Sequence, residues 1–199
     1  MTGLSRTTML TGFAVLLTVV AAGPPPTPPA PPDVASIGTI AGNNEPGERL
    51  SVSGQVFAPD GATPAGGVIV YAYQTDGGGE YHNDPATRVA RLHGWAKTDA
   101  RGHYEFRTIR PGPYPGRGVP AHIHFHIYGG GYPLQWTPEL LFADDPLVRP
   151  EQVQSSVAMG KFANVQAPRR AGDGSQHCVF NIRASATSNY PPGASTEPQ

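Results

Sequence analysis

The chain has 199 residues, with 14 Lys and Arg against 15 Asp and Glu and a formal net charge of −1. Charged residues make up only 15% of the chain, which argues against the basic surface of a nucleic-acid-binding protein and against an acidic interaction tail. The length suits one domain with tails, and the 25 Gly and 23 Pro favour turn-rich β structure within it.

The N-terminal residues have the layout of a secretory signal. Arg6 precedes an apolar stretch over 9–20, and Ala21 and Ala22 supply the small residues of a cleavage site. A membrane anchor is the alternative, but the apolar stretch is shorter than the ~20 residues that a spanning helix needs. We therefore predict a signal peptide over 1–22, no membrane insertion after its cleavage, and an exported protein that is periplasmic, in the cell envelope or extracellular.

Two further segments frame the presumed domain. Residues 23–35 contain the tract PPPTPPAPP, which predicts a stiff, extended and solvated linker. Residues 185–199 are polar and rich in proline, which predicts a disordered tail. The remaining residues, 36–184, form the predicted domain.

Short alternating segments in this domain predict an all-β fold. Strands are expected at 50–57, 67–73, 91–98, 103–109, 121–128 and 176–183. The regions 138–142 and 149–160 fit short helices or loops. Cys178 is the only cysteine, so no intrachain disulfide can form, and its parity in the last strand places it in the core. We expect a β-sandwich of mostly antiparallel strands with long loops.

Three histidines alternate along one of the predicted strands. Residues two apart in a strand point to the same face, so His122 and His124 can reach one ion from one rigid element. This pair alone is weak support for a metal site. Because His126 continues the same parity, a zinc or copper site built from all three histidines is an open alternative.

Two tyrosines precede the histidines in loops. Tyr81 follows a run of three glycines, and Tyr114 lies between two prolines whose rings restrict the backbone. Each by itself could be an ordinary loop aromatic. Together with His122 and His124, however, they offer two phenolates and two imidazoles. This set suits Fe(III), a hard ion that favours anionic oxygen and accepts imidazole nitrogen.

The motifs in this order are GEY at 79–81, the stretch 98–115, PAHIHF at 120–125 and FADDPL at 142–147. This arrangement resembles the intradiol ring-cleavage dioxygenases, which include protocatechuate 3,4-dioxygenases and catechol 1,2-dioxygenases, and the similarity runs from about Ser51 to Arg183.

The resemblance implies a catalytic β-sandwich over 36–184 whose long loops carry the active site. It implies Fe(III) held by four ligands, which are Tyr81, Tyr114, His122 and His124. The implied reaction uses O₂ to cleave a catechol-type aromatic diol to a cis,cis-muconate-type diacid. Tyr114 would leave the metal when the diol binds and would accept one of its protons.

Two positions depart from the pattern of this family. An arginine commonly precedes the PAH motif, but Val119 stands there in this chain. Arg117 either takes over the arginine's role in stabilising charge on the substrate or is a solvated loop residue. Glu139 stands where a glutamine is common, and a carboxylate there would disfavour anionic substrates.

A non-catalytic reading of the sequence also exists. The segments 53–56 and 64–68 resemble transthyretin-like domains, which bind or support other proteins. That resemblance does not account for the tyrosines and the histidine pair together. Colour separates the iron site from the zinc alternative, because ferric tyrosinate absorbs visible light and a zinc site does not.

Overall fold

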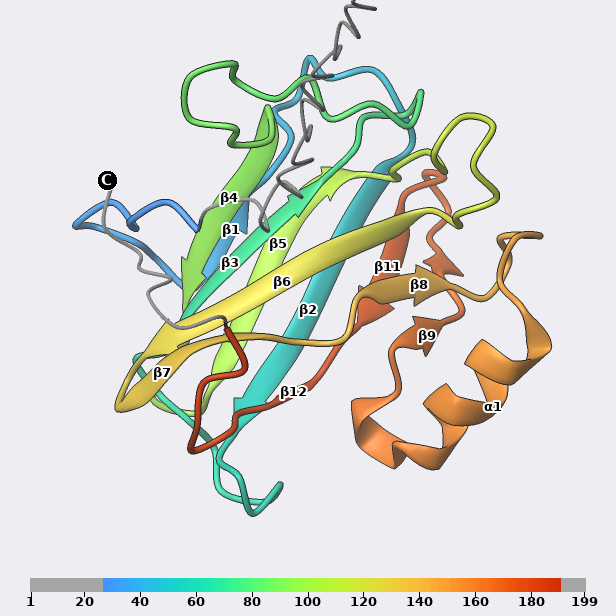
Figure 1. Cartoon of the computed structure of the whole chain (residues 1–199). Coiled ribbons are helices and arrows are strands. Elements are labelled where there is room, and N and C mark those ends of the chain that lie inside the picture. Colours follow the sequence, from blue (N-terminus) through green and yellow to red (C-terminus); the bar gives the residue numbers. More distant parts are fainter. Residues whose placement is uncertain (1–26, 191–199) are drawn as a thin grey trace, which may run out of the picture.

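Two six-stranded β-sheets pack face to face in the fold, shown in Figure 1 as a computed structural model that describes residues 27–190. The first sheet has the order β1-β5-β2-β11-β10, and β12 also pairs with β2. Its strands are β1 (Ile37–Thr39), β2 (Arg49–Phe57), β5 (His103–Ile109), β10 (Arg169–Arg170), β11 (Gln176–Val179) and β12 (Ile182–Arg183).

The second sheet has the order β4-β3-β6-β8-β9, and β7 also pairs with β6. Its strands are β3 (Ile69–Gln74), β4 (Leu92–Lys97), β6 (His122–Gly129), β7 (Tyr132–Trp136), β8 (Leu140–Phe142) and β9 (Val165–Gln166). The helix α1 (Pro150–Ala158) and the short 3₁₀ turn η1 (Gly160–Phe162) lie beside β8 and β9 in Figure 1. The central pairs β2–β5, β3–β4 and β3–β6 are antiparallel, which confirms the predicted sandwich.

The core lies between the two sheets, where alternate residues of each strand point inward. Val52, Phe106 and Phe125 have no more than 1% of their surface exposed. The Phe125 ring lies 6.1 Å from that of Phe106 and 4.9 Å from that of Phe180, measured between ring centroids. Burial of such side chains contributes roughly 1.5–3 kcal/mol each and fixes how the sheets stack.

The outer face of the second sheet is also covered. The burial pattern of β3 has five consecutive buried residues, as the apolar character of both its parities predicts. Tyr71 and Tyr73 point to this outer face, where their rings stack 5.7 Å apart. His124 pairs with Tyr73 across the strands, and His126 pairs with Tyr71. The outer face therefore holds the histidines in an aromatic layer and not in solvent.

Most of the predicted strands are present, but the structure also differs from the prediction, and the short strands β7, β9 and β10 were not predicted. Residues 140–142 form strand β8, although a helix or loop was expected there, because they pair with both β6 and β9. The strand expected over 176–183 is divided into β11 and β12, both parallel to β2. The short edge strand β1, which pairs in parallel with β5, was not predicted. Helix α1 occupies most of the region 149–160.

Thr27 and Tyr190 meet at His126 on the outer face of the second sheet. The Thr27 hydroxyl lies 2.6 Å from His126 Nδ1 and 2.7 Å from the Tyr190 hydroxyl, and the Tyr190 hydroxyl lies 2.7 Å from the same Nδ1. Thr27 is only 2% exposed. We call these three residues the terminal latch.

The terminal segments differ from the expected linker and tail where the structure describes them. Thr27 is buried although a solvated linker was predicted over 23–35. Asn189 both accepts from and donates to the backbone of Trp136, so 185–190 follow the edge of β7. The predicted signal peptide over 1–22 and the outer parts of both segments lie outside the described residues. Within the described range, the chain contains no helix with the length and apolarity to cross a membrane.

Candidate metal centre

Four side-chain donor atoms form a closed ring of short contacts. The Tyr81 hydroxyl lies 2.5 Å from the Tyr114 hydroxyl, which lies 3.2 Å from His122 Nε2. His122 Nε2 lies 3.0 Å from His124 Nε2, which lies 2.9 Å from the Tyr81 hydroxyl. The structure thus brings together all four residues that the sequence singled out as ligands.

The tautomers of the two histidines follow from their other contacts. His122 Nδ1 lies 2.7 Å from the carbonyl oxygen of Pro120, which can only accept a hydrogen bond. Nδ1 of His122 therefore carries a proton, and in the neutral imidazole this leaves Nε2 bare. His124 Nδ1 lies 3.3 Å from a carboxylate oxygen of Glu139, which favours the same tautomer. Two bare nitrogens facing each other repel, and a cation between them converts this repulsion into ligation.

Burial shapes the protonation of the other donors. Burial raises the pKa of Tyr81, and the adjacent Tyr114 hydroxyl raises it further. Burial also raises the pKa of Tyr114, although the hydrogen bond from Tyr81 opposes this. Burial lowers the pKa of His124, which keeps its imidazole neutral and able to bind a metal. Two phenols with raised pKa values ionise together only beside a highly charged cation, so the donor set fits such an ion.

The spacing of the donors agrees with this fit. A first-row metal ion binds imidazole nitrogen at about 2.0–2.1 Å, which separates neighbouring ligands by roughly 3 Å. The four contacts of the ring range from 2.5 to 3.2 Å. The four donors are thus spaced as ligands of one ion.

Strand β6 positions the two histidines. His124 stacks on Tyr73 of β3, with ring centroids 4.5 Å apart and an angle of 12° between the planes. His122 pairs with Leu141 of β8 on the other side. The planes of the His122 and His124 rings lie at 86° to each other, and their Nε2 atoms are 3.0 Å apart.

Asp145 secures the start of this strand, and the sequence analysis did not single it out. The residue is 8% exposed, and its carboxylate accepts hydrogen bonds from Ala121 N at 2.7 Å and from Leu147 N at 2.9 Å. Ala121 directly precedes His122, so Asp145 links the segment 142–147 to the first histidine. Its place in the FADDPL motif was the available signal.

Tyr114 is carried by a tight hairpin between β5 and β6. Its backbone N–H donates to the Val119 carbonyl at 3.3 Å, and Gly116 and Gly118 have φ angles of 68° and 64°. Glycine adopts such positive φ angles without steric cost. Arg117 is exposed in this hairpin. Its charge acts against the effect of burial on the Tyr114 pKa. The backbones of Val119 and Tyr114 form an isolated antiparallel bridge.

His126 does not join the ring. Both Thr27 and Tyr190 bind its Nδ1, and burial lowers its pKa to about 3, so it is neutral. In the described part of the chain, the group of possible ligands around the pair is His122, His124 and Glu139. Glu139 contacts Nδ1 of His124, on the ring edge away from Tyr81. The site built from three histidines therefore has no support in this geometry.

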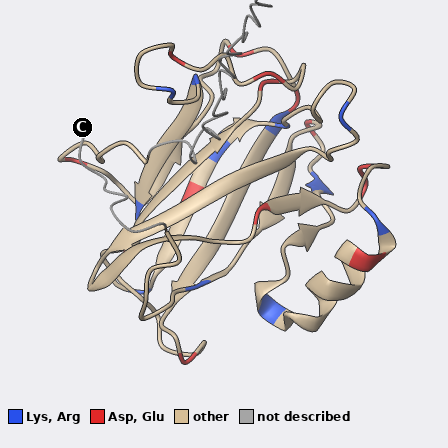
Figure 2. Ribbon diagram, in the orientation of Figure 1, with Lys and Arg blue, Asp and Glu red and all other residues tan. Residues whose placement is uncertain are grey.

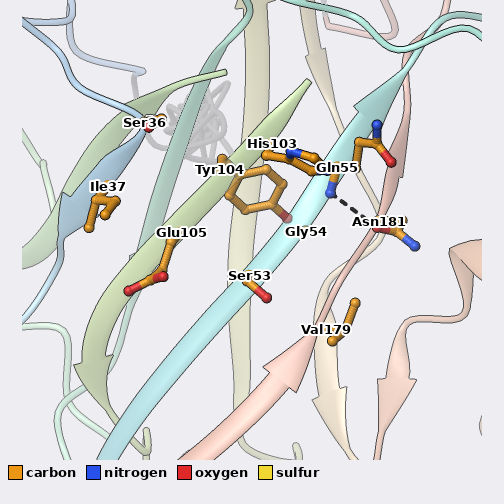
Figure 3. A pocket seen from close by; sticks show the side chains of 10 residues that line it. All are labelled: Ser36, Ile37, Ser53, Gly54, Gln55, His103, Tyr104, Glu105, Val179 and Asn181. Carbon is orange, nitrogen blue, oxygen red and sulfur yellow. Dashed lines mark hydrogen bonds between the residues drawn. The ribbon is translucent and has the colours of Figure 1, made fainter. Parts of the chain in front are cut away.

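A hollow of about 400 Å³ on the first sheet is separate from the metal centre (Figure 3). Polar residues of β2 and β5, among them Ser53, Gln55 and Glu105, line it. A hydrogen bond of 3.0 Å from Gln55 N to the Asn181 side chain closes one side. The hollow includes none of the four residues Tyr81, Tyr114, His122 and His124.

Basic and acidic residues are interspersed over the fold in the view of Figure 2.

Comparisons with known proteins identify the family of this chain. A family model described as "Dioxygenase" matches residues 22–186. The chain belongs to the intradiol dioxygenase family. Because the match extends over the whole sandwich, the reading as a transthyretin-like binding module is not supported.

Curated relatives of this dioxygenase family member share part of their length with it. The protocatechuate 3,4-dioxygenase beta chain of Burkholderia cepacia is 34% identical over 118 residues, which cover 53% of this chain and 50% of that protein. Catechol 1,2-dioxygenase 1 of Acinetobacter lwoffii is 33% identical over 118 residues, which cover 50% of this chain and 37% of that protein. The chain thus spans about half or less of the length of these relatives.

Solved structures share the fold. The dioxygenase domain of a dioxygenase carbohydrate-binding protein fusion from Streptomyces sp. SirexAA-E has a TM-score of 0.57 and 28% identity, covering 81% of this chain and 99% of that one. The 3-chlorocatechol 1,2-dioxygenase of Rhodococcus opacus 1CP has a TM-score of 0.59 and 22% identity, covering 82% and 69%. The second likeness concerns the fold alone.

Proposed function

We propose that this chain is a non-haem Fe(III) intradiol dioxygenase that cleaves an uncharged catechol with O₂ to a cis,cis-muconate-type diacid. The observation that carries the proposal is the ring formed by Tyr81, Tyr114, His122 and His124, in which both histidines present bare nitrogens. Two phenolates and two imidazoles suit Fe(III) better than zinc, which is bound mostly by sulfur and nitrogen.

The chain's own residues have distinct roles in this reaction. When bound, Fe(III) supplies a Lewis acid that orients the diol and favours its ionised form. Tyr81 is packed against Tyr73 and remains in place. Tyr114 lies in an exposed hairpin, so it can move away and accept one proton of the diol. Glu139 and Tyr73 hold the orientation of His124.

The test is reconstitution of the purified protein with ferric iron. We expect one iron per chain, a red-brown tyrosinate absorption, and consumption of equal amounts of catechol and O₂ without an added reductant. A colourless protein that retains stoichiometric zinc and stays inactive after ferric reconstitution would overturn the proposal.

The negative charge of Glu139 underlies the proposed preference for uncharged diols. Replacing Glu139→Gln keeps an oxygen that can accept from His124 but removes the charge. We expect kcat/KM for a carboxylated catechol to rise about 5- to 10-fold relative to catechol, since removing one repulsive charge near the site is worth about 1 kcal/mol. Glu151→Gln, an exposed carboxylate of α1 paired with Arg149, is the matched control and should leave this ratio unchanged. An unchanged ratio in the Glu139 variant would contradict the preference.

Arg117 is proposed to contribute only weakly from its exposed position in the hairpin. We expect Arg117→Ala to keep its iron and colour and to lose less than about tenfold in kcat, because exposed charges are screened by water. A loss of ~10²–10³ in kcat would instead show direct stabilisation of developing charge. In that case Arg117 would replace the arginine missing at Val119. Arg101→Ala, in the turn before β5, controls for the change in net charge.

We also propose that the protein is exported and that its signal peptide is removed after residue 22. The apolar stretch 9–20 and the small residues Ala21 and Ala22 support this. N-terminal sequencing of the protein produced in a bacterial host with an intact export pathway tests it. A mature protein that begins at Gly23 is expected, and a full-length protein in the cytoplasm would contradict export.

A further inference from the structure

The two tyrosines of the metal centre come from separate loops. Tyr81 lies in the loop between β3 and β4, and Tyr114 lies 33 residues later in the loop between β5 and β6. The 2.5 Å contact between their hydroxyls requires these loops to be placed accurately against each other. Neither tyrosine lies on a strand, so the sheets alone do not fix this placement.

The backbones of the two loops are in direct contact. Gly112 N donates to the Asp76 carbonyl at 2.8 Å, and the Thr75 hydroxyl donates to the Gly112 carbonyl at 2.8 Å. A Cβ atom on Gly79 would lie 2.0 Å from the Pro113 carbonyl oxygen, and one on Gly112 would lie 2.5 Å from that of Gly77. No side chain fits between the loops at these positions, so the close contact of the two backbones requires glycine at both.

Asp76 organises the first of these loops. Its Oδ1 accepts from Gly78 N at 2.9 Å and from Glu80 N at 3.1 Å. Its backbone N–H donates to the Glu80 carbonyl at 3.0 Å, and its own carbonyl accepts from Gly79 N at 3.1 Å. Asp76 therefore closes the loop 76–80 on itself, one residue before Tyr81.

The second oxygen of Asp76 is bound from the other side of the loop. Oδ2 lies 2.9 Å from His82 Nε2 and 3.7 Å from a guanidinium nitrogen of Arg91. Arg91 in turn forms two contacts of 2.8 Å with Glu45, and its backbone N–H donates to the Tyr81 carbonyl at 3.1 Å. Burial opposes ionisation of Asp76, but the hydrogen bonds from Glu80, Gly78 and His82 outweigh it and hold the pKa of Asp76 below its usual value.

We propose that Asp76 is a positioning residue that holds the two tyrosine loops in register, so that the hydroxyls of Tyr81 and Tyr114 meet at one ion. The side chain fixes the loop 76–80, and the Asp76 carbonyl then receives Gly112 from the second loop. The inference rests on the proposed function for the identity of the ion, but the registration of the loops concerns the protein alone.

Asp76→Ala is the first test, and Asp60→Ala is its matched control. Asp60 accepts from Ala62 N and Thr63 N in the turn after β2, so it closes a similar turn whose bonds stay within it. We expect Asp76→Ala to raise the dissociation constant for ferric iron by roughly 10–100-fold, as loss of an outer partner of a metal ligand does, and to weaken or shift the tyrosinate absorption. Asp60→Ala should match the wild type in both.

Amide hydrogen exchange in the metal-free protein provides an independent measurement. Faster exchange in the loop 76–82 is expected from any change at Asp76 and does not discriminate. Faster exchange at Gly112 and Tyr114 of the second loop is the expected sign of lost registration. It should be absent in Asp60→Ala.

The outcomes separate this inference from the proposed function. A wild-type protein without iron or colour would overturn the proposed function, and the exchange of Gly112 would still report on the loops. The inference would be overturned if the wild type is coloured and Asp76→Ala has the same iron affinity, the same absorption and the same exchange at Gly112.

Asp76→Asn is the second variant, for the case in which Asp76→Ala does not fold. It keeps one oxygen for Gly78 N and Glu80 N but loses the charge facing His82. It should give smaller shifts of the same sign, and no shift in any of the three measurements would also overturn the inference.

Discussion

His124→Ala is expected to abolish stoichiometric binding of ferric iron. The substitution removes one of the four donors and leaves the Tyr81 hydroxyl and His122 Nε2 without their shared neighbour. Loss of an outer partner alone costs about 10–100-fold in metal affinity, and loss of a ligand should cost more than 100-fold. Metal analysis of the protein reconstituted with iron, together with its visible spectrum, measures the effect.

His126→Ala is the matched control on the same strand and the same face. Its side chain binds Thr27 and Tyr190, so its removal takes one hydrogen-bond partner from each hydroxyl, although the two hydroxyls still bond to each other, and leaves a cavity in the aromatic layer. This should destabilise the fold by roughly 1–3 kcal/mol. Iron content and colour should nevertheless remain. Loss of metal in His126→Ala, with iron retained in His124→Ala, would reverse the assignment of the histidines.

Tyr81→Phe is expected to damage the resting metal centre more than Tyr114→Phe damages substrate binding. The phenylalanine ring keeps the packing of Tyr81 against Tyr73 and Tyr114, whose ring centroids lie 6.0 and 5.7 Å away. Only the donor oxygen is lost, so the fold should persist while iron affinity falls by at least about 100-fold. The tyrosinate absorption of any remaining iron should weaken.

Tyr114→Phe provides the comparison, because Tyr114 is the ligand proposed to leave when the diol binds. Its resting spectrum should change, whereas its spectrum with bound catechol should approach that of the wild type. Turnover should decrease, since one acceptor for the protons of the diol is missing. Evidence that Tyr114 remains a ligand in the wild-type catechol complex would contradict its proposed role.

The alternation of apolar residues was sufficient to predict the long strands and the sandwich. Segments such as 50–57 and 103–109 keep one face in the core over their whole length, which produces a clear period of two. Strand β8 was missed because Leu140, Leu141 and Phe142 are all buried and show no alternation. The contacts of Thr27 and Tyr190 were missed because they depend on partners 99 and 64 residues away, which no local pattern encodes.

For the proposed metal centre, the sequence indicated the four candidate donors but not the contacts that bring them together. The parity of His122 and His124 follows from strand geometry, and Tyr81 and Tyr114 entered through the order of motifs. The tautomers depend on Pro120 and Glu139, and the register of the loops depends on Asp76 and Gly112. These are backbone and tertiary contacts, so they become visible only in three dimensions.

The terminal latch has a consequence for how this domain joins other sequence. The side-chain hydroxyls of Thr27 and Tyr190 lie 2.7 Å apart, so the two ends of the described chain lie on the same side of the sandwich, within side-chain reach of each other. Domains whose ends lie together can be inserted into a loop of a host protein or circularly permuted. A short bridge from residue 190 to residue 27, with new ends opened at the exposed turn around Asp60, should therefore give a permuted chain that folds to the same sandwich. The metal centre would then lie on a continuous stretch away from both new ends.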